Sequence, residues 1–208
     1  MARSDSRRGQ VSLFVIIVGI ALFFAVRGNL ESSLENPELG VVYDYYLGCI
    51  EGETRAALDL AGSGGGRIDP GVYEAGSGFM PQGNQLNFLG RNVPYWFYVS
   101  GNGVVKENVP SMSEIEQEIE EYVADRIRGC DFEELYRDGF EITVEHGDVD
   151  VEILHDRVNV RSAGILSASK GESSGVKRSH EIEVLSQFGG FYDGAREIYE
   201  KQRDEAFL

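Results

Sequence analysis

An apolar run close to the N-terminus constrains this chain more than any other feature of its sequence. Residues 11–26 read VSLFVIIVGIALFFAV and contain no charged side chain. From Gly9 to Val26 a helix would be about 27 Å long at ~1.5 Å per residue, at the short end of what spans a hydrocarbon core of roughly 30 Å. We therefore expect a single transmembrane anchor over residues 11–27, with the lipid bilayer as the partner of residues 11–26. The side chains expected to anchor it are Val11, Phe14, Ile16, Ile17, Leu22, Phe23 and Phe24.

The charges on either side of this run predict its orientation. Arg3, Arg7 and Arg8 precede the run, whereas Arg27 is the only base that follows it before Glu31. By the positive-inside rule, the N-terminus is cytoplasmic and the protein is a single-pass protein of the cell membrane with its C-terminal part outside. The expected organisation is a basic cytoplasmic segment 1–10, the anchor 11–27, a linker 28–37 and an extracytoplasmic domain 38–208.

Three other interpretations of the apolar run are open. A cleaved secretory signal would have a shorter apolar region and a small-x-small cleavage site, which the residues after Phe24 do not provide. The pair Arg7-Arg8 is typical of a twin-arginine export signal, but Gly9 and Gln10 stand where that signal has apolar residues. A buried core helix would carry polar side chains over four turns. The uncleaved anchor fits the pattern best.

The segment from Arg7 to Phe14, RRGQVSLF, resembles the class III, pilin-like leaders of archaeal proteins. Such leaders join a basic stretch to Gly-Gln-x-Ser and an apolar helix, and they are cut between the Gly and the Gln. The resemblance implies processing between Gly9 and Gln10, with a filament subunit as the product. This chain departs from the family pattern at Phe14, where the family carries a Glu that sets the register of neighbouring subunits.

A wider resemblance covers the order of features along the chain. The leader and span precede a helix with Cys49, Gly-rich turns, the strand segment 93–98 and a helix that ends at Cys130, and further strands follow. This order is similar to that of a group of uncharacterised single-span membrane proteins of archaea. The resemblance implies a location and an architecture, and it implies no mechanism.

The charge of the chain is divided between two unlike parts. The whole sequence has a net charge of -16, but residues 1–27 hold one acid and four bases, which leaves 34 acids and 15 bases, or -19, for the remainder. Such a surface excludes a general nucleic-acid binder, which needs bases to replace phosphate counterions. Four lysines stand beside fifteen arginines, a balance that resembles the proteins of extreme halophiles. An ordinary acidic protein is the alternative.

Periodicity predicts about three packed helices in the outer domain. The first runs from Pro37 to about Leu60 and stops at the glycines of residues 62–66. The second begins with a capping box of Ser111 and Glu114 and ends at Gly129. The acids expected to face water on this second helix are Glu116, Glu118, Glu120 and Glu121. The third runs from about residue 191 to residue 206, and the side chains expected to face inward are Phe191, Ala195, Ile198 and Tyr199.

Alternating apolar and polar residues predict the strands. One strand spans 93–99 and turns at Ser100–Gly103 into a hairpin, and further strands fall at 140–145, 149–153, 158–160 and 182–184. Each of these later strands has one apolar face, which is typical of an antiparallel sheet with a solvated side. The predicted fold is therefore an N-terminal transmembrane helix followed by a small α+β domain.

Cys49 and Cys130 are the only cysteines in the chain. In the oxidising environment outside a cell, an even pair usually closes, so we expect a disulfide. The chain-entropy estimate for a loop of this length is roughly 4 to 5 kcal/mol. Two buried free thiols are the alternative.

Motifs that carry chemistry are absent from the sequence. The Gly62–Gly66 run lacks the Gly-Lys-Ser/Thr ending of a phosphate loop, and Asp148, Asp150 and Glu152 lack the Gly and Glu of a calcium loop. The aromatic run 95–98 could stack sugars, although core packing explains most of it. His146, His155 and His180 show no metal-ligand spacing. We predict no catalytic residue, no metal ligand and no cofactor.

The sequence thus predicts a membrane-anchored cell-surface protein with a structural or interaction role and with protein partners at the cell surface. The pilin-like filament subunit, processed before Gln10, is an alternative of the same class. An extracytoplasmic hydrolase that uses acids and one of the histidines is the alternative of another class. A cleft that gathers a histidine with two carboxylates would favour the hydrolase.

Overall fold

The computed structural model describes residues 37–78, 81 and 83–205. The predicted cytoplasmic segment, the anchor with its lipid-facing side chains, the processing site at Gly9 and Gln10, and nearly all of the linker lie outside the described residues. Among the residues that are described, no helix combines the length and the apolar character needed to cross a bilayer.

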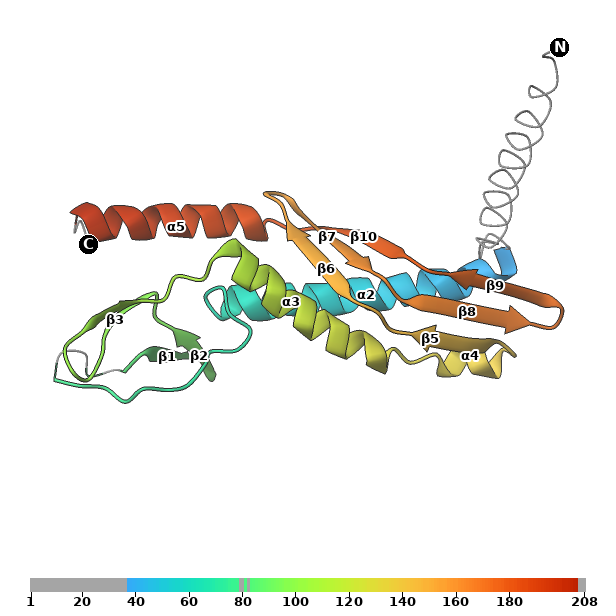
Figure 1. The fold of residues 1–208 in the computed structure, drawn as a ribbon, viewed down its shortest axis with the longest axis horizontal. Helices are drawn as coiled ribbons and strands as arrows, with labels where there is room; N and C mark the ends of the chain where they lie inside the picture. The colour runs from blue at the N-terminus through green and yellow to red at the C-terminus, as the bar shows by residue number, and fades with distance from the viewer. Residues whose placement is uncertain (1–36, 79–80, 82, 206–208) are drawn as a thin grey trace, which may run out of the picture.

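Helix α2, Pro37–Ser63, lies along the long axis of the molecule (Figure 1). Its buried side chains recur every three or four residues, which is the spacing of one helical face: Leu39, Val42, Tyr46, Ile50, Thr54, Ala57, Leu58 and Ala61. Gly48 and Gly52 fall on the exposed side, where a missing side chain removes no packing. The helix predicted from residue 37 is therefore confirmed.

Helix α3, Met112–Arg126, crosses α2 and buries Ile115, Ile119 and Val123 (Figure 1). The predicted capping box is present, because the Ser111 side chain accepts a hydrogen bond from the Glu114 amide and the Glu114 carboxylate accepts one from the Ser111 amide. A 3-10 turn, η1 (Ile127–Gly129), continues the helix to Cys130.

Two three-stranded antiparallel sheets lie end to end along α2 (Figure 1). One has the order β10-β7-β6, with bounds His180–Leu185, Arg157–Ser162 and Val149–Ile153. The other has the order β5-β8-β9, with bounds Glu141–Glu145, Ile165–Lys170 and Ser173–Lys177, and the short helix α4 (Glu133–Arg137) precedes it. Their inner faces join α2 and α3 in one apolar core. The α+β class with antiparallel sheets is confirmed.

Three of the four α3 glutamates that were expected to face water do not. Glu116 and Glu120 accept hydrogen bonds from backbone amides of β6, and Glu118 accepts one from the amide of Ile68. These three side chains are half-buried, and Glu121 alone is exposed. The expectation was wrong because each carboxylate stands at the border of the buried face, where a strand or a loop presents unpaired amides.

The chain between α2 and α3, residues 64–110, forms a lobe at one end of α2 (Figure 1). Two antiparallel hairpins build this lobe: β1 (Gln85–Phe88) with β2 (Arg91–Pro94), and β3 (Phe97–Val99) with β4 (Val105–Glu107). The strand predicted over 93–99 is thus divided between β2 and β3. The predicted hairpin turn is confirmed, since the Gly103 amide donates to the Ser100 carbonyl at 2.8 Å.

Helix α5, Phe188–Glu205, follows β10 and extends over the lobe (Figure 1). Phe191 and Ile198 are 76% and 57% exposed, and Ala195 is exposed as well, so their predicted inward position was wrong. Tyr192 and Tyr199 face the lobe instead, which confirms only the expectation for Tyr199. The Tyr192 hydroxyl donates a hydrogen bond to the Pro110 carbonyl at 2.6 Å. This bond holds the Tyr192 side of α5 against the lobe.

The predicted disulfide is present. Cys49 in the middle of α2 joins Cys130 at the end of η1, with 6.1 Å between the two Cα atoms and a sequence separation of 81. The bond links the two helices that form the centre of the core.

Candidate binding groove

The aromatic run of the lobe divides between its core and its surface. Tyr98 is buried, whereas Phe97 is 45% exposed, as the alternation of a strand requires. Trp96 precedes the strand and is half-buried, and its indole Nε1 donates to the Gly65 carbonyl at 2.8 Å. Gly65 has a φ of +68°, and a Cβ there would lie 3.0 Å from Val93. The Gly65 carbonyl therefore holds the indole N–H of the tryptophan in place.

Helix α5 supplies the opposite wall. Tyr192 and Tyr199 are seven residues apart, two helical turns, so both rings project toward the lobe. The Trp96 ring lies 6.3 Å from Tyr192 and 5.8 Å from Tyr199, in edge-on geometry in both cases. Edge-to-face aromatic pairs at this separation are favourable beyond the area that they bury. The three rings fix α5 against the lobe.

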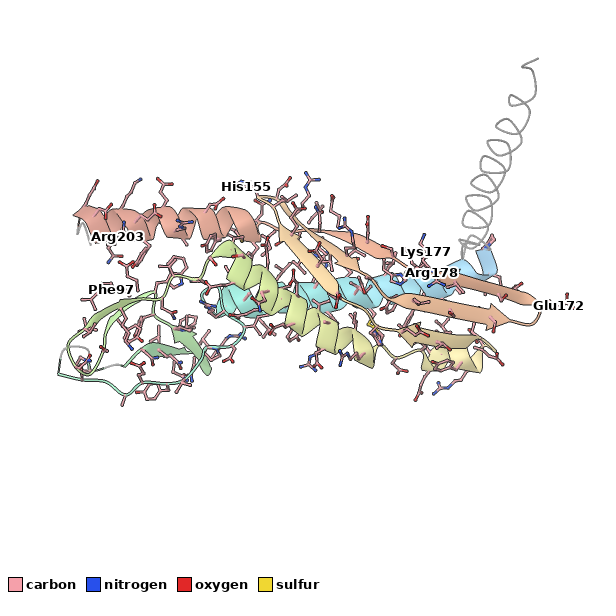
Figure 2. The ribbon with its side chains drawn as sticks, viewed as in Figure 1. Phe97, His155, Glu172, Lys177, Arg178 and Arg203 are labelled. Atoms are coloured by element: carbon pink, nitrogen blue, oxygen red, sulfur yellow. A yellow bond between two sulfur atoms is a disulfide. The ribbon has the colours of Figure 1, made fainter. Side chains whose placement is uncertain are left out.

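Beside these rings a cavity of about 480 Å³ opens between the lobe and α5. We call it the aromatic groove, and it is lined by Tyr95, Trp96, Phe97, Tyr199, Gln202 and Arg203. Figure 2 shows Phe97 and Arg203 facing one another across the space between β3 and α5. The volume is within the range of roughly 300–1,000 Å³ that is usual for ligand pockets.

A smaller cavity of about 240 Å³ adjoins the groove and shares Tyr199 and Arg203 with it. Its polar walls include Glu107, Arg196 and Glu200. Arg196 pairs with Glu200 at 3.2 Å within α5. The two cavities therefore lie side by side along the face of α5 that carries Tyr199 and Arg203.

The polar groups of the groove combine donors with acceptors. Arg203 lies 2.9 Å from Asp204 and 4.0 Å from Glu107, and the hydrogen bond to Asp204 raises the pKa of its guanidinium. Burial raises the pKa of the Tyr199 phenol, so this group stays a neutral hydroxyl at ordinary pH. Its oxygen is buried and makes no short hydrogen bond among the described residues, and the nearby Glu107 carboxylate adds to the rise in pKa. The groove thus offers flat apolar rings edged by hydrogen-bonding groups.

A wider depression of about 770 Å³ lies on the outer face of the β10-β7-β6 sheet. Its carboxylates have partners: Arg161 pairs with Asp150 and Glu181, Arg157 with Glu183, and Asn159 donates to Glu152. Among the described residues, no group of three or more His, Cys, Asp or Glu side chains could hold a metal ion. We therefore assign this depression to the solvated face that the alternation of these strands predicts.

The three histidines lie in three unlike surroundings. His180 is buried against Tyr46, with 4.9 Å between ring centroids, and His155 is exposed beside Asp193 at the start of α5. His146 is exposed after β5, where burial and the nearby charge of Arg128 lower its pKa. None of them lines the aromatic groove or the adjoining cavity as the structure describes them. These two cavities therefore do not bring a histidine together with carboxylates.

Sequence reasoning found one wall of the groove and missed the other. The run 95–98 was noted for its ability to stack sugars, but Gln202 and Arg203 were not noticed. A signal was present, since Tyr199, Gln202 and Arg203 are spaced i, i+3 and i+4 and share one helical face. The pairing of that face with residues about 100 positions earlier has no sequence signature.

Comparison with protein-family models, with curated proteins and with solved structures finds no match for this chain. The groove is therefore interpreted from its own chemistry.

Proposed function

We propose that this chain is a membrane-anchored cell-surface protein whose outer domain acts as an interaction module. Residues 11–26 hold it in the bilayer, the N-terminus is cytoplasmic, and the aromatic groove contacts the partner. The leader resemblance supports the filament alternative, in which the same domain is displayed on a fibre after processing before Gln10.

The proposed location has three supports. The first is the apolar run with arginines on its N-terminal side. The second is the Cys49–Cys130 disulfide, because such bonds persist in oxidising surroundings outside the cytoplasm. The third is the carboxylate-rich outer domain, which stays soluble by charge repulsion and suits a saline exterior.

The aromatic groove is the observation that supports the proposed interaction role. Exposed aromatic side chains are enriched at binding surfaces because they bury a large area at a low cost in side-chain entropy. Phe97 and Trp96 line a cavity of ligand size while they remain partly open to solvent.

Site-specific photo-crosslinking tests this role. A photoreactive phenylalanine replaces Phe97 in the full chain in intact cells, and the matched control carries it at Phe88, which is 58% exposed in the same lobe outside the groove. We expect an adduct from position 97 and none from position 88. Equal labelling at both positions, or no adduct at either, would contradict the interaction role.

A further inference from the structure

We infer that the aromatic groove binds a neutral saccharide, an inference that rests on the interaction role proposed for the same groove. Three observations point to this ligand class: the exposed aromatic rings, the mixture of donors and acceptors, and the balance of charge at the groove.

The rings match the apolar faces of sugars. A pyranose ring has faces of C–H groups and an edge of hydroxyls, so it covers an aromatic ring while its hydroxyls point sideways. Trp96, Phe97 and Tyr199 line one cavity, and Phe97 is partly open to solvent while the Trp96 indole N–H is already bonded to a backbone carbonyl. The tryptophan therefore offers a ligand its ring and not its polar atom.

The polar walls match hydroxyl groups in particular. A hydroxyl both donates and accepts, so a site for several hydroxyls needs both kinds of partner. Arg203 and Gln202 supply donors in the groove, and Glu107 and Glu200 supply acceptors in the adjoining cavity. Tyr199 lines both cavities, and because its hydroxyl oxygen is buried, it offers a ligand its ring.

The charge at the groove favours a neutral ligand. The charged side chains that line the two cavities are Arg196, Arg203, Glu107 and Glu200, so their formal charges cancel, although residues 28–208 as a whole have an excess of 19 acids. Both arginines already pair with carboxylates, Arg196 with Glu200 and Arg203 with Asp204 and Glu107. A phosphate or a sulfated chain would therefore gain no net charge attraction from this lining.

A proline-rich peptide is the main rival, because such peptides also dock on aromatic-lined grooves. A polyproline segment offers carbonyl acceptors, but its proline nitrogens have no N–H to donate. Glu107 and Glu200 would then face a ligand without donors. The acceptors of the adjoining cavity favour the saccharide.

The test uses the full chain in a detergent that has no sugar headgroup, in molar salt. The protein is titrated with neutral tetrasaccharides of glucose, mannose and N-acetylglucosamine, and with an oligoproline peptide. Calorimetry gives the affinity, and the fluorescence of Trp96, the only tryptophan in the chain, reports the groove. We expect at least one tetrasaccharide to bind and to shift the emission.

Variants locate the binding. Phe97→Ala is expected to weaken saccharide binding roughly tenfold, which is the loss of one well-packed aromatic contact. Arg203→Ala is expected to weaken it as well, whereas Phe88→Ala should bind like the wild type. Because Phe97 and Arg203 are exposed, their removal leaves the core intact, and circular dichroism verifies the fold.

Binding of the oligoproline without any saccharide would overturn the inference, and so would saccharide binding that Phe97→Ala and Arg203→Ala leave unchanged. The two proposals fail separately. An adduct from position 97 in cells, combined with no saccharide binding, would refute the saccharide and leave the interaction role in place. Saccharide binding that depends on Phe97, without an adduct in cells, would keep the ligand class and refute only the proposed contact with a partner in intact cells.

Discussion

The Glu116 carboxylate accepts a hydrogen bond from the backbone amide of Ile153 at 2.8 Å. Glu120, one helical turn later, accepts one from the amide of Val151 at 3.0 Å. Both amides belong to β6, the edge strand of its sheet, whose outward groups have no strand partner. Exposed edges of this kind promote pairing with other chains, so α3 protects the sheet as well as packing on it.

Removal of these carboxylates should destabilise the domain. We expect Glu116→Ala and Glu120→Ala to lower the free energy of unfolding by about 1–3 kcal/mol each, because each leaves a part-buried amide without its charged acceptor. The matched control is Glu121→Ala, an exposed position whose hydrogen bond to Gln117 is local, with an expected effect below about 0.5 kcal/mol. Denaturant unfolding measures all three. If the three variants lost the same free energy of unfolding, the hydrogen bonds from Glu116 and Glu120 to β6 would contribute nothing specific to stability.

Reduction of the disulfide should also destabilise the domain. The Cys49–Cys130 bond closes a loop with a sequence separation of 81, for which chain entropy gives roughly 4 to 5 kcal/mol. We expect reduction to lower the denaturant midpoint of the wild type. The midpoint of the double variant, Cys49→Ser with Cys130→Ser, should be the same with and without reductant. Alkylation followed by mass spectrometry checks the bond itself. Two alkylatable thiols in the native protein would contradict the disulfide.

His180 should make stability depend on pH. Burial lowers the pKa of this imidazole, which is surrounded by Tyr43, Tyr46 and the nearby charge of Lys177. A histidine whose pKa is lower in the folded state contributes full stability above its unfolded pKa of about 6.5, and that stability is lost as the pH falls toward the folded value. His180→Gln should remove this part of the pH dependence.

The control for this prediction is His155→Gln, since His155 is exposed and packs in no core. The free energy of unfolding is measured between pH 7.5 and pH 5 for the wild type and for both variants, where about pH 6.5 marks the expected onset. A wild type and a His180→Gln variant with parallel profiles would refute the role of the buried imidazole.

Salt should stabilise the outer domain. Residues 28–208 carry an excess of 19 acids, which repel one another in dilute salt, and molar salt reduces the screening length to about 3 Å. We expect circular dichroism to show a higher thermal midpoint in molar potassium chloride than in dilute buffer. A protein that is equally stable in both would not support a halophilic origin of this surface.

The fold was predictable where a local pattern decides the structure. The capping box at Ser111 and Glu114 depends on two residues one turn apart, and β6 alternates strictly between buried valines and exposed acids. Strands β8 and β9 had no such pattern. They read ILSASK and SSGVK, and their small and polar residues are not typical of strands, although Leu166 is fully buried.

The aromatic groove was predictable only in part, because its two walls come from segments that are far apart in sequence and meet only in the folded chain. Phe191 and Tyr192 are adjacent aromatic residues on α5, and the sequence pattern led to the wrong one, Phe191, as the inner residue. The lobe decides between them through the carbonyl that accepts the Tyr192 hydroxyl. The same contact brings Arg203 opposite Phe97 and so creates the groove (Figure 2).

The interaction role of the groove is tested most directly by fluorine NMR of Trp96. The chain has one tryptophan, so 5-fluorotryptophan gives a single resonance from the groove wall. Soluble cell-envelope material from the producing organism is added to the full chain, and binding is verified independently by sedimentation. We expect the resonance to shift in the wild type and in Phe88→Ala, and to shift much less in Phe97→Ala. An unchanged Trp96 resonance, whether or not the material binds elsewhere, would contradict the assignment of the groove as the binding site.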